Sequence, residues 1–354
     1  MNYSQKIVIE DLTPGLRISI ALATYNGEKY LGEQLDSLSR QKLLPFELVV
    51  TDDGSSDSTL DILEAFSEAA PFPVRLFRNA TRLGYEENFL HAASLCCGDV
   101  IAFCDQDDVW MDRKLEVCAP SFANPSIVGV LHTGQTMRGS GELGQFHPHF
   151  PTARVFAPGD FYPFEQSPGY SMLIRRELVN LADSGNRHHL LKSHDKWFCL
   201  LAANVGCLAT LPEVLVWYRQ HDSNVFGVPT REGFLPAIRS YAGAYDYTVE
   251  ADAAQYCALV LERVAESFPE RAHLVERGAR KFRYQSGLHR LRTQMYQPES
   301  NFFSRVAKYV RIVFLGGYIP DRAWHRLGFK RGIKDMLWGV SGAYRIFMNI
   351  HTAG

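Results

Sequence analysis

Apolar runs alternate with helix-like patterns over the first 120 residues of the chain. Each run is short and rich in Val, Ile, Leu or Phe, and most end in polar residues; the runs are LRISIALATYNG, FELVVTDDGSSD, PVRLFRN and DVIAFCDQDD. Between them apolar residues recur at helical spacing, as Leu31, Leu35 and Leu38 do. This alternation predicts an α/β fold with a parallel, doubly wound sheet.

The pattern changes after Ala119. Strands are predicted in SIVGVLHTG, GYSMLIRREL and ATLPEVLVWYRQHDSNV, and a helix in SHDKWFCLLAANVG. The stretch from Gly139 to Pro168 is rich in Gly, Pro, His and Phe, which predicts long loops. From about Glu232 onward the pattern is helical. We therefore expect one α/β domain over 1–228 and a helical extension over 229–354.

Polar clusters follow three of the predicted strands: TYNG, TDDGSSD and DQDD. The carboxyl ends of parallel strands meet at one edge of a sheet, and ligands bind beyond that edge. We therefore expect the three clusters to contribute to a single binding site.

Three carboxylates lie within four positions of one another, at Asp105, Asp107 and Asp108. Carboxylates this close repel one another, and a divalent cation, Mg²⁺ or Mn²⁺, would offset the repulsion. Mg²⁺ typically takes one or two protein carboxylates and completes its shell with substrate phosphates. The alternative is a solvated turn whose aspartates cap the helix that begins near Met111.

Asp52 and Asp53 form a second acidic pair at the end of another predicted strand. An aspartate there can accept a hydrogen bond from a nucleobase imide or a ribose hydroxyl, or can serve only in the turn. The chain contains neither a Walker P-loop nor a GxGxxG motif, so a glycine-rich loop does not hold the nucleotide.

Two further polar clusters lie later in the chain. KSHDKW places Asp195 at a predicted helix start, where it is a candidate general base or an N-cap residue. WYRQHDSN places Arg219, His221 and Asn224 at a strand end. His221 is a candidate metal ligand or phosphate donor, or belongs to an ordinary surface loop.

The composition is that of a globular protein, with 354 residues, 46% hydrophobic and 21% charged. The net charge of −2 gives no indication of nucleic-acid binding. The charge is unevenly distributed: residues 271–345 hold 16 Lys and Arg against 4 Asp and Glu, a balance of +12, which leaves −14 for the rest. A basic tail on an acidic body indicates an anionic partner for the tail, such as a membrane surface.

The seven cysteines form no CxxC pair and lie mostly in apolar runs, so they predict neither a disulfide framework nor a zinc site. The first residues show no signal-peptide pattern, and no apolar run approaches the ~20 residues of a spanning helix. We therefore expect a cytoplasmic location, with peripheral attachment to a membrane left open by the basic tail.

Six motifs occur in an order that resembles the inverting glycosyltransferases of family 2: ALATYNGEKYLGEQLDSL, VVTDDGSSDST, RLGYEENF, CDQDDVW, HDKW and YRQHDSN. The forms TYNG, DQDDVW and YRQH are most similar to the bacterial rhamnosyltransferase branch. The resemblance implies the GT-A fold, a doubly wound, mixed and mostly parallel sheet flanked by helices, here with a helical C-terminal extension. It implies a metal-dependent, inverting hexosyltransferase that moves L-rhamnose from dTDP-L-rhamnose to a glycan or lipid-linked glycan. Its products would be bacterial O-antigen, capsule or exopolysaccharide.

The resemblance also implies which residues bind the nucleotide sugar. Thr24 and Tyr25 match the segment that lines the nucleobase pocket, and Asp53 matches the carboxylate that contacts the base. Asp105 matches a contact to the ribose. The complete implied set is Thr24, Tyr25, Asn26, Asp52, Asp53, Arg82, Asp105, Gln106 and Asp107.

Metal binding and catalysis are implied for Asp107 and for two further positions. Asp107 matches the ligand of the Mg²⁺ or Mn²⁺ ion that bridges the diphosphate, and His221 matches a position that completes this site in some relatives. Asp195 matches the catalytic base, although His194 stands before it where the family often has Glu.

The basic tail contains NFFSRVAKYVRIVFLGGYIPDRAWHRLGFKRGIKDMLWGV, in which aromatic, aliphatic and basic residues are interleaved. Such segments are typical of interfacial helices, which would hold the enzyme at the cytoplasmic face of the inner membrane beside a lipid-linked acceptor. The alternative is that the apolar face of these helices packs on the catalytic domain.

Other functions share some of these features. A transferase with a UDP-hexose donor would use the same site. A nucleotidyltransferase normally has a phosphate loop rich in Gly and Lys or Arg after the first strand, where this chain has TYNGEKY. A non-catalytic relative would have lost the DxD motif or the base, and both are present.

Overall fold

The computed structural model divides the chain into two compact units, and each is described by itself. The first comprises Met1–Pro158 with Pro163–Val228, and the second Gly159–Tyr162 with Pro229–Gly354. The structure describes residues 15–139, 141–164, 167–181, 191–221, 247–319 and 328–341. Asn224 lies outside these ranges.

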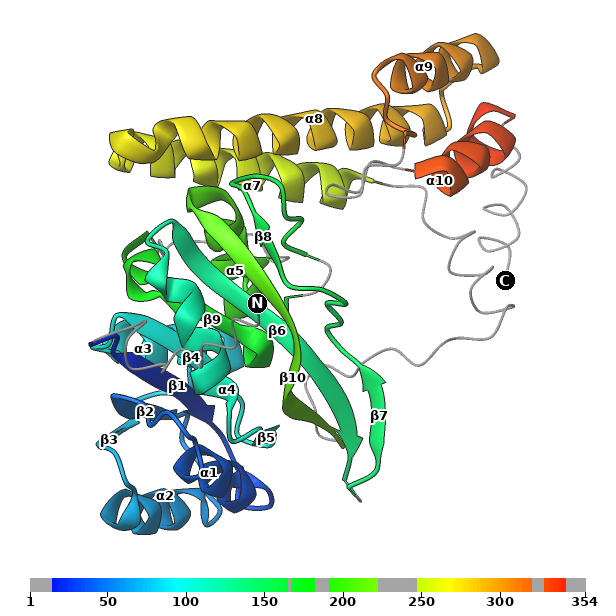
Figure 1. The fold of residues 1–354 in the computed structure, drawn as a ribbon. Helices are drawn as coiled ribbons and strands as arrows, with labels where there is room; N and C mark the ends of the chain where they lie inside the picture. The colour runs from blue at the N-terminus through cyan, green and yellow to red at the C-terminus, as the bar shows by residue number, and fades with distance from the viewer. Residues whose placement is uncertain are drawn as a thin grey trace, which may run out of the picture. The chain divides into compact units, whose positions relative to one another are not determined.

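One mixed sheet forms the centre of the first unit, with the strand order β3-β2-β1-β4-β9-β6-β10-β5 (Figure 1). β3, β2, β1 and β4 are parallel, as are β6 and β10, whereas β9, β5, β7 and β8 run antiparallel to their neighbours. The strands are β1 (Ile18–Thr24), β2 (Glu47–Asp52), β3 (Val74–Arg78), β4 (Val100–Cys104), β5 (Val109–Trp110), β6 (Ile127–Arg138), β7 (Leu143–Phe146), β8 (Arg154–Phe156), β9 (Met172–Arg175) and β10 (Cys207–Gln220).

Helices flank this sheet and supply much of its core. They are α1 (Leu31–Ser39), α2 (Thr59–Ala69), α3 (Tyr85–Leu95), α4 (Lys114–Cys118) and α5 (His194–Val205). The predicted inner face of α1 is confirmed, because Leu31, Leu35 and Leu38 are buried against the sheet. β1, β2 and β4 are buried along their whole length, which explains why they are mainly apolar and do not alternate with polar residues at every second position. The predicted α/β fold is therefore confirmed.

The stretch from Gly139 to Pro168 differs from the expected loops, because it contains β7 and β8. β7 pairs with the end of β6, and all four of its residues are exposed, so no apolar alternation indicated a strand. β10 is long and irregular. Its pairing with β6 shifts register between Leu211 and Val214, where Pro212 cannot donate a ladder hydrogen bond.

The second unit is helical in its described part, as predicted. Its elements are α7 (Thr248–Ser267), α8 (Ala272–Tyr296), α9 (Phe302–Phe314), α10 (Gly328–Lys334) and a π-helical turn (Asp335–Val340). α7 packs along α8, and α9 packs on α8 (Figure 1). Among the helices that the structure describes, none is both long and apolar enough to cross a membrane.

Candidate active site

The polar clusters of the first unit lie where three neighbouring strands end. Thr24, the last residue of β1, is in register with Asp52, the last residue of β2. β4 pairs with the other side of β1 and ends at Cys104, directly before Asp105. Because these strands are parallel and adjacent, their polar ends meet at one edge of the sheet.

Asp52 organises the loop that follows β2. Its Oδ1 accepts hydrogen bonds from the backbone N–H groups of Gly54 (3.1 Å) and Ser55 (2.9 Å). Its Oδ2 accepts from the hydroxyls of Thr24 (3.0 Å) and Ser55 (2.5 Å). Asp52 and Thr24 are buried, and Gly54 adopts a φ of 86°, which favours glycine. The buried side chains of Asp52 and Thr24 therefore fix the loop after β2 through hydrogen bonds.

Asp53 fixes the segment that leads into α3. Its Oδ1 accepts hydrogen bonds from Leu83 N (2.6 Å) and Asn79 Nδ2 (3.0 Å), and its Oδ2 accepts from Gly84 N (2.8 Å). The Asp53 carboxylate is buried, so these bonds are shielded from water. This carboxylate positions the backbone directly after Arg82.

Arg82 and Tyr25 stack at the surface of the site. The guanidinium carbon of Arg82 lies 4.0 Å from the centroid of the Tyr25 ring, and the tyrosine is 37% exposed. The Gln106 side chain fixes the backbone of Tyr25, because its Oε1 accepts from Tyr25 N (2.9 Å) and its Nε2 donates to Tyr25 O (3.1 Å). A Cβ atom on Gly27 would lie 2.5 Å from Gln106 Oε1, so this contact requires glycine.

Asn26 continues the same loop with a φ of 46°, a left-handed conformation that asparagine tolerates. Its Oδ1 accepts a hydrogen bond from Ser56 N (2.9 Å), and its own N–H donates to Ser55 Oγ (2.9 Å). Asn26 thus joins the loop after β1 to the loop after β2. The result is a rigid support for the exposed Tyr25 ring.

The acidic loop after β4 carries a concentrated negative charge. Burial, followed by the charges of Asp107 and Asp195, raises the pKa of Asp105 to about 8. Burial and the charges of Asp107 and Asp105 also raise the pKa of Asp108, whose Oδ2 has no hydrogen-bond partner among the described residues. Negative charges near Asp105 and Asp108 thus add to the effect of burial and disfavour the charged form of both carboxyls.

The end of β10 holds this acidic loop in place. Arg219 donates from its backbone N to Asp108 Oδ1 (2.9 Å), and from Nε to Asp107 O (2.8 Å). The other end of the same guanidinium contacts Glu33 of α1 at 2.5 Å. His221 is the first residue after β10, and its Nε2 lies 2.8 Å from Asp107 Oδ2. The two residues predicted as metal ligands are therefore in contact with each other.

Asp195 lies in the first turn of α5, at the N-terminal position that the sequence indicated. Its Oδ1 accepts hydrogen bonds from Ser193 Oγ (2.5 Å) and Lys196 N (2.6 Å). His194 points into the core, where it stacks on Phe89 with ring centroids 3.9 Å apart. His194 thus anchors the start of the helix, while Asp195 is half-buried at the site.

Lys114 is a residue of this site that the sequence reasoning missed. Lys114 is fully buried in α4. Its Nζ donates a hydrogen bond to Tyr170 O (2.7 Å) and lies 3.4 Å from the centroid of the Trp110 ring. Its charge lowers the pKa of both Asp105 and Asp108, while burial lowers its own pKa to about 8. The sequence did offer one signal, because Lys114 stands next to Leu115, a buried residue of α4.

A divalent cation fits Asp107 and His221 as a partial ligand set. Within the described ranges, no group of three or more His, Cys, Asp or Glu side chains is arranged to hold a metal. Two protein ligands are consistent with an Mg²⁺ or Mn²⁺ ion whose other ligands come from a diphosphate and water. Because burial and the neighbouring carboxylates disfavour the charged form of Asp105, a bound cation would stabilise that form.

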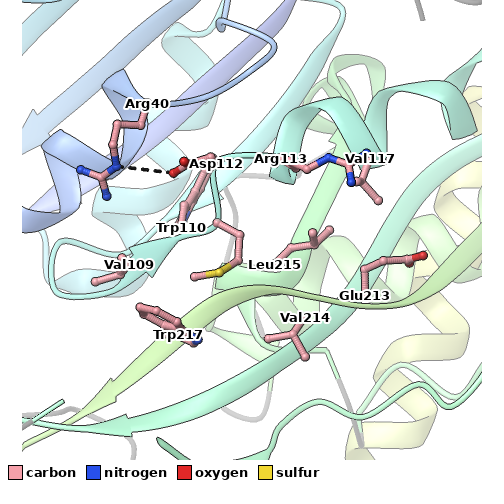
Figure 2. Close-up of a pocket in the computed structure, with 11 residues that line it drawn as sticks. Arg40, Val109, Trp110, Asp112, Arg113, Val117, Glu213, Val214, Leu215 and Trp217 are labelled. Atoms are coloured by element: carbon pink, nitrogen blue, oxygen red, sulfur yellow. Dashed lines mark ion pairs between the residues drawn. The ribbon is translucent and has the colours of Figure 1, made fainter. Parts of the chain in front are cut away.

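A separate pocket of about 530 Å³ lies beside the acidic loop and is lined by residues of β5, of β10 and of the segment after β5 (Figure 2). Its walls include Val109, Leu215 and Trp217, and an ion pair between Arg40 and Asp112 (3.4 Å) lies at one side. No residue predicted to bind the nucleotide sugar lines it. This pocket is therefore distinct from the candidate donor site.

Comparisons with known proteins show which family and which fold the chain resembles. Residues 19–180 match the glycosyl transferase family 2 model. An uncharacterized glycosyltransferase of Nostoc sp. is 27% identical over 216 residues, which cover 59% of this chain and 66% of that protein. The dTDP-rhamnosyl transferase RfbG of Shigella flexneri is 35% identical over 99 residues, which cover 27% of this chain and 34% of that protein. The match thus spans less than two thirds of either relative.

The fold gives an independent comparison. The crystal structure of S. aureus TarS 1-349 in complex with UDP superposes with a TM-score of 0.53 and 18% identity, and covers 87% of this chain and 82% of that chain. This likeness supports the predicted GT-A type of sheet. Residues 19–180 are thus similar to the glycosyl transferase family 2, and the fold of the chain agrees with that likeness.

Proposed function

We propose that the chain transfers a sugar from a nucleoside diphosphate donor to a hydroxyl of a glycan or lipid-linked glycan, with inversion at the anomeric carbon. The proposed donor is dTDP-L-rhamnose, because a relative is named a dTDP-rhamnosyl transferase and the motifs resemble that branch. A UDP-hexose is the alternative donor, in view of the UDP bound to TarS. The product would belong to a bacterial cell-surface polysaccharide.

One observation carries this proposal. Asp105 and Asp107 directly follow β4, beside the polar ends of β1 and β2, and burial, followed by the charges of Asp107 and Asp195, raises the pKa of Asp105. Charge of this density at strand ends is typical of a site completed by a cation and a diphosphate. A purely structural turn would have its oxygens satisfied by the loop itself, as those of Asp52 are.

Each part of the site has a role in the proposed reaction. The exposed Tyr25 ring offers a stacking surface for the nucleobase, and Arg82 offers a positive charge beside it. Asp195 accepts the proton of the acceptor hydroxyl, and positioned general bases typically contribute ~10²–10⁴-fold to the rate. A bound Mg²⁺ or Mn²⁺ ion at Asp107 and His221 would offset the negative charge of the leaving diphosphate.

The acceptor and the location are proposed together. We place the enzyme in the cytoplasm with its basic C-terminal helices at the inner face of the membrane, where a lipid-linked acceptor would be presented. The charge balance of +12 over 271–345 supports this placement.

The test is release of a nucleoside diphosphate from a panel of donors, dTDP-L-rhamnose and UDP-hexoses, with Mg²⁺ or Mn²⁺ and without either. We expect release with dTDP-L-rhamnose and a loss of release in Asp107→Asn or after removal of divalent ions. Faster release from a UDP-hexose would show that the proposed donor is wrong, and the proposed transfer reaction would stand. Release of pyrophosphate from a sugar phosphate and a nucleoside triphosphate would instead indicate a nucleotidyltransferase.

A further inference from the structure

The outward face of α9 is apolar, which is the reverse of an ordinary surface helix. Phe303, Val310 and Phe314 are 82%, 40% and 87% exposed. With exposed Ala307 they occupy positions i, i+4, i+7 and i+11, which form one stripe along a helix. Their alignment distinguishes them from the scattered exposed apolar residues that any protein has.

The inward face of α9 fixes this orientation. Arg305 is buried, and its guanidinium donates to Ser300 O (2.5 Å) and Val340 O (3.1 Å). Ile312 is also fully buried and packs on Leu288 of α8. Turning the stripe inward would break these contacts and leave a buried arginine unpaired, so the phenylalanines remain outside.

Apolar side chains continue beyond this stripe. Val313, Leu315 and Ile319 are 48%, 46% and 58% exposed. We call these three residues, together with Phe303, Val310 and Phe314, the α9 surface. Arg311 is exposed beside it, and the surrounding sequence, 271–345, carries a balance of +12. The surface therefore combines exposed aromatic and aliphatic groups with a basic setting.

We propose that the α9 surface inserts into the headgroup region of an anionic lipid bilayer, with the helix lying in the plane of the membrane. Helices that bind in this way have an apolar face with Phe and Leu and a basic surrounding that is attracted to anionic lipids. A 13-residue helix is too short to span the bilayer, which requires ~20 residues. The proposal rests on the membrane placement proposed above and names the surface responsible for it, and it does not depend on the donor or the reaction.

The test is flotation of the full chain with lipid vesicles in the absence of any nucleotide sugar. One set of vesicles contains phosphatidylcholine alone, and the other also contains phosphatidylglycerol. We expect binding to the anionic vesicles that weakens as salt is raised, because screening reduces the attraction. The double variant Phe303→Ser/Phe314→Ser should bind the anionic vesicles at least about tenfold more weakly, since the two largest exposed groups of the surface are lost.

Leu44→Ser is the matched control, because Leu44 lies in the first unit and is 45% exposed, like Leu315 at 46%. It should bind vesicles as the unchanged chain does. Circular dichroism of the double variant should show the original helix content, since both phenylalanines face solvent.

Three outcomes would overturn the proposal. The double variant could bind anionic vesicles as tightly as the unchanged chain, or the unchanged chain could bind both kinds of vesicle equally. In the third outcome, the unchanged chain does not bind vesicles but forms dimers, and the double variant does not form them. The α9 surface would then be a contact between two copies of the chain. Release of nucleoside diphosphate, measured without lipid, tests the proposed reaction separately.

Discussion

Each unit buries an acidic site, and the two sites differ in how their oxygens are satisfied. Asp335, in the second unit, is fully buried and accepts four hydrogen bonds. They come from Arg292 Nε (2.7 Å) and Nη2 (3.0 Å), Tyr296 OH (2.9 Å) and Tyr318 OH (2.8 Å). In the first unit, Asp108 Oδ2 has no partner in the described part of the chain, and the pKa of Asp105 is raised to about 8.

The buried cations differ in the same way. Arg292 forms two parallel hydrogen bonds with Asp335 and also lies over the Tyr247 ring at 3.6 Å. Lys114 contacts a carbonyl oxygen and the Trp110 ring. Burying charge is costly unless it is paired. A satisfied group fixes one packing arrangement, whereas an unsatisfied acidic cluster retains a charge that a ligand can neutralise.

Asp195→Asn tests the catalytic side of this comparison and should have the largest effect. We expect transfer to fall by about 10²–10⁴-fold, because the amide cannot accept the proton of the acceptor hydroxyl. Donor affinity and thermal unfolding should change little. Transfer kinetics, together with calorimetry of donor binding, make the measurement.

Asp112→Asn is the control for that substitution. Asp112 is also in the first unit, but it forms an exposed ion pair with Arg40. It should retain its transfer rate within about twofold, because exposed pairs contribute little. An equal loss of transfer in both variants, or none in Asp195→Asn, would move the base to another residue.

Asp335→Asn tests the structural side. We expect a loss of about 3–5 kcal/mol in the free energy of unfolding, because the buried Arg292 guanidinium loses its counter-charge. Asp252→Asn is the matched control in the same unit, since its pair with Arg290 is exposed and 3.9 Å long, and it should cost under about 0.5 kcal/mol. Denaturant unfolding measures both, and similar values would contradict the comparison.

The sheet was predictable where its strands are buried on both faces, because β1, β2 and β4 then contain short apolar runs. β7 and β8 were not, since they are short and are held by hydrogen bonds to β6 and β10 that leave no periodic pattern. The basic amphipathic character of α9 was also visible. Its outward orientation was not, because that depends on the partners of Arg305.

The candidate site was predictable from the placement of polar residues after strands. The same signal could not separate Asp52, whose oxygens are used within the loop, from Asp105, whose charged form is disfavoured by burial and by neighbouring carboxylates. Both are aspartates at strand ends, and only the three-dimensional contacts distinguish them. The roles in donor binding and catalysis therefore stay predictions.

Lys114→Met tests the coupling between the buried cation and the acidic loop. Methionine preserves much of the side-chain length but removes the charge that lowers the pKa of Asp105. That pKa should rise further, so donor binding with Mg²⁺ should weaken about tenfold at neutral pH and recover at higher pH. Calorimetry over a range of pH measures the shift. The exposed Lys42→Met is the control, and identical pH profiles for the two variants would exclude this coupling.

His289→Gln should have the smallest effect, and it acts in the unit whose charges are paired. Burial, followed by the charges of Arg292 and Arg331, lowers the pKa of His289 from 6.5 to about 3. Above pH 6.5 the folded and unfolded states are both neutral at this residue. As the pH falls from 6.5 toward 3, the unfolded state takes up the proton first, and the free energy of unfolding falls by up to about 1.4 kcal/mol per pH unit.

The variant should lose this part of the acid sensitivity, which urea unfolding at several pH values would show as a shallower slope. His273→Gln is the control on the same helix, where the side chain is exposed in the folded state, and its slope should match that of the unchanged chain. A slope that His289→Gln leaves unchanged would mean that other groups set the response to acid. Acid would then act on the second unit through groups other than the neutral histidine beside its buried ion pair.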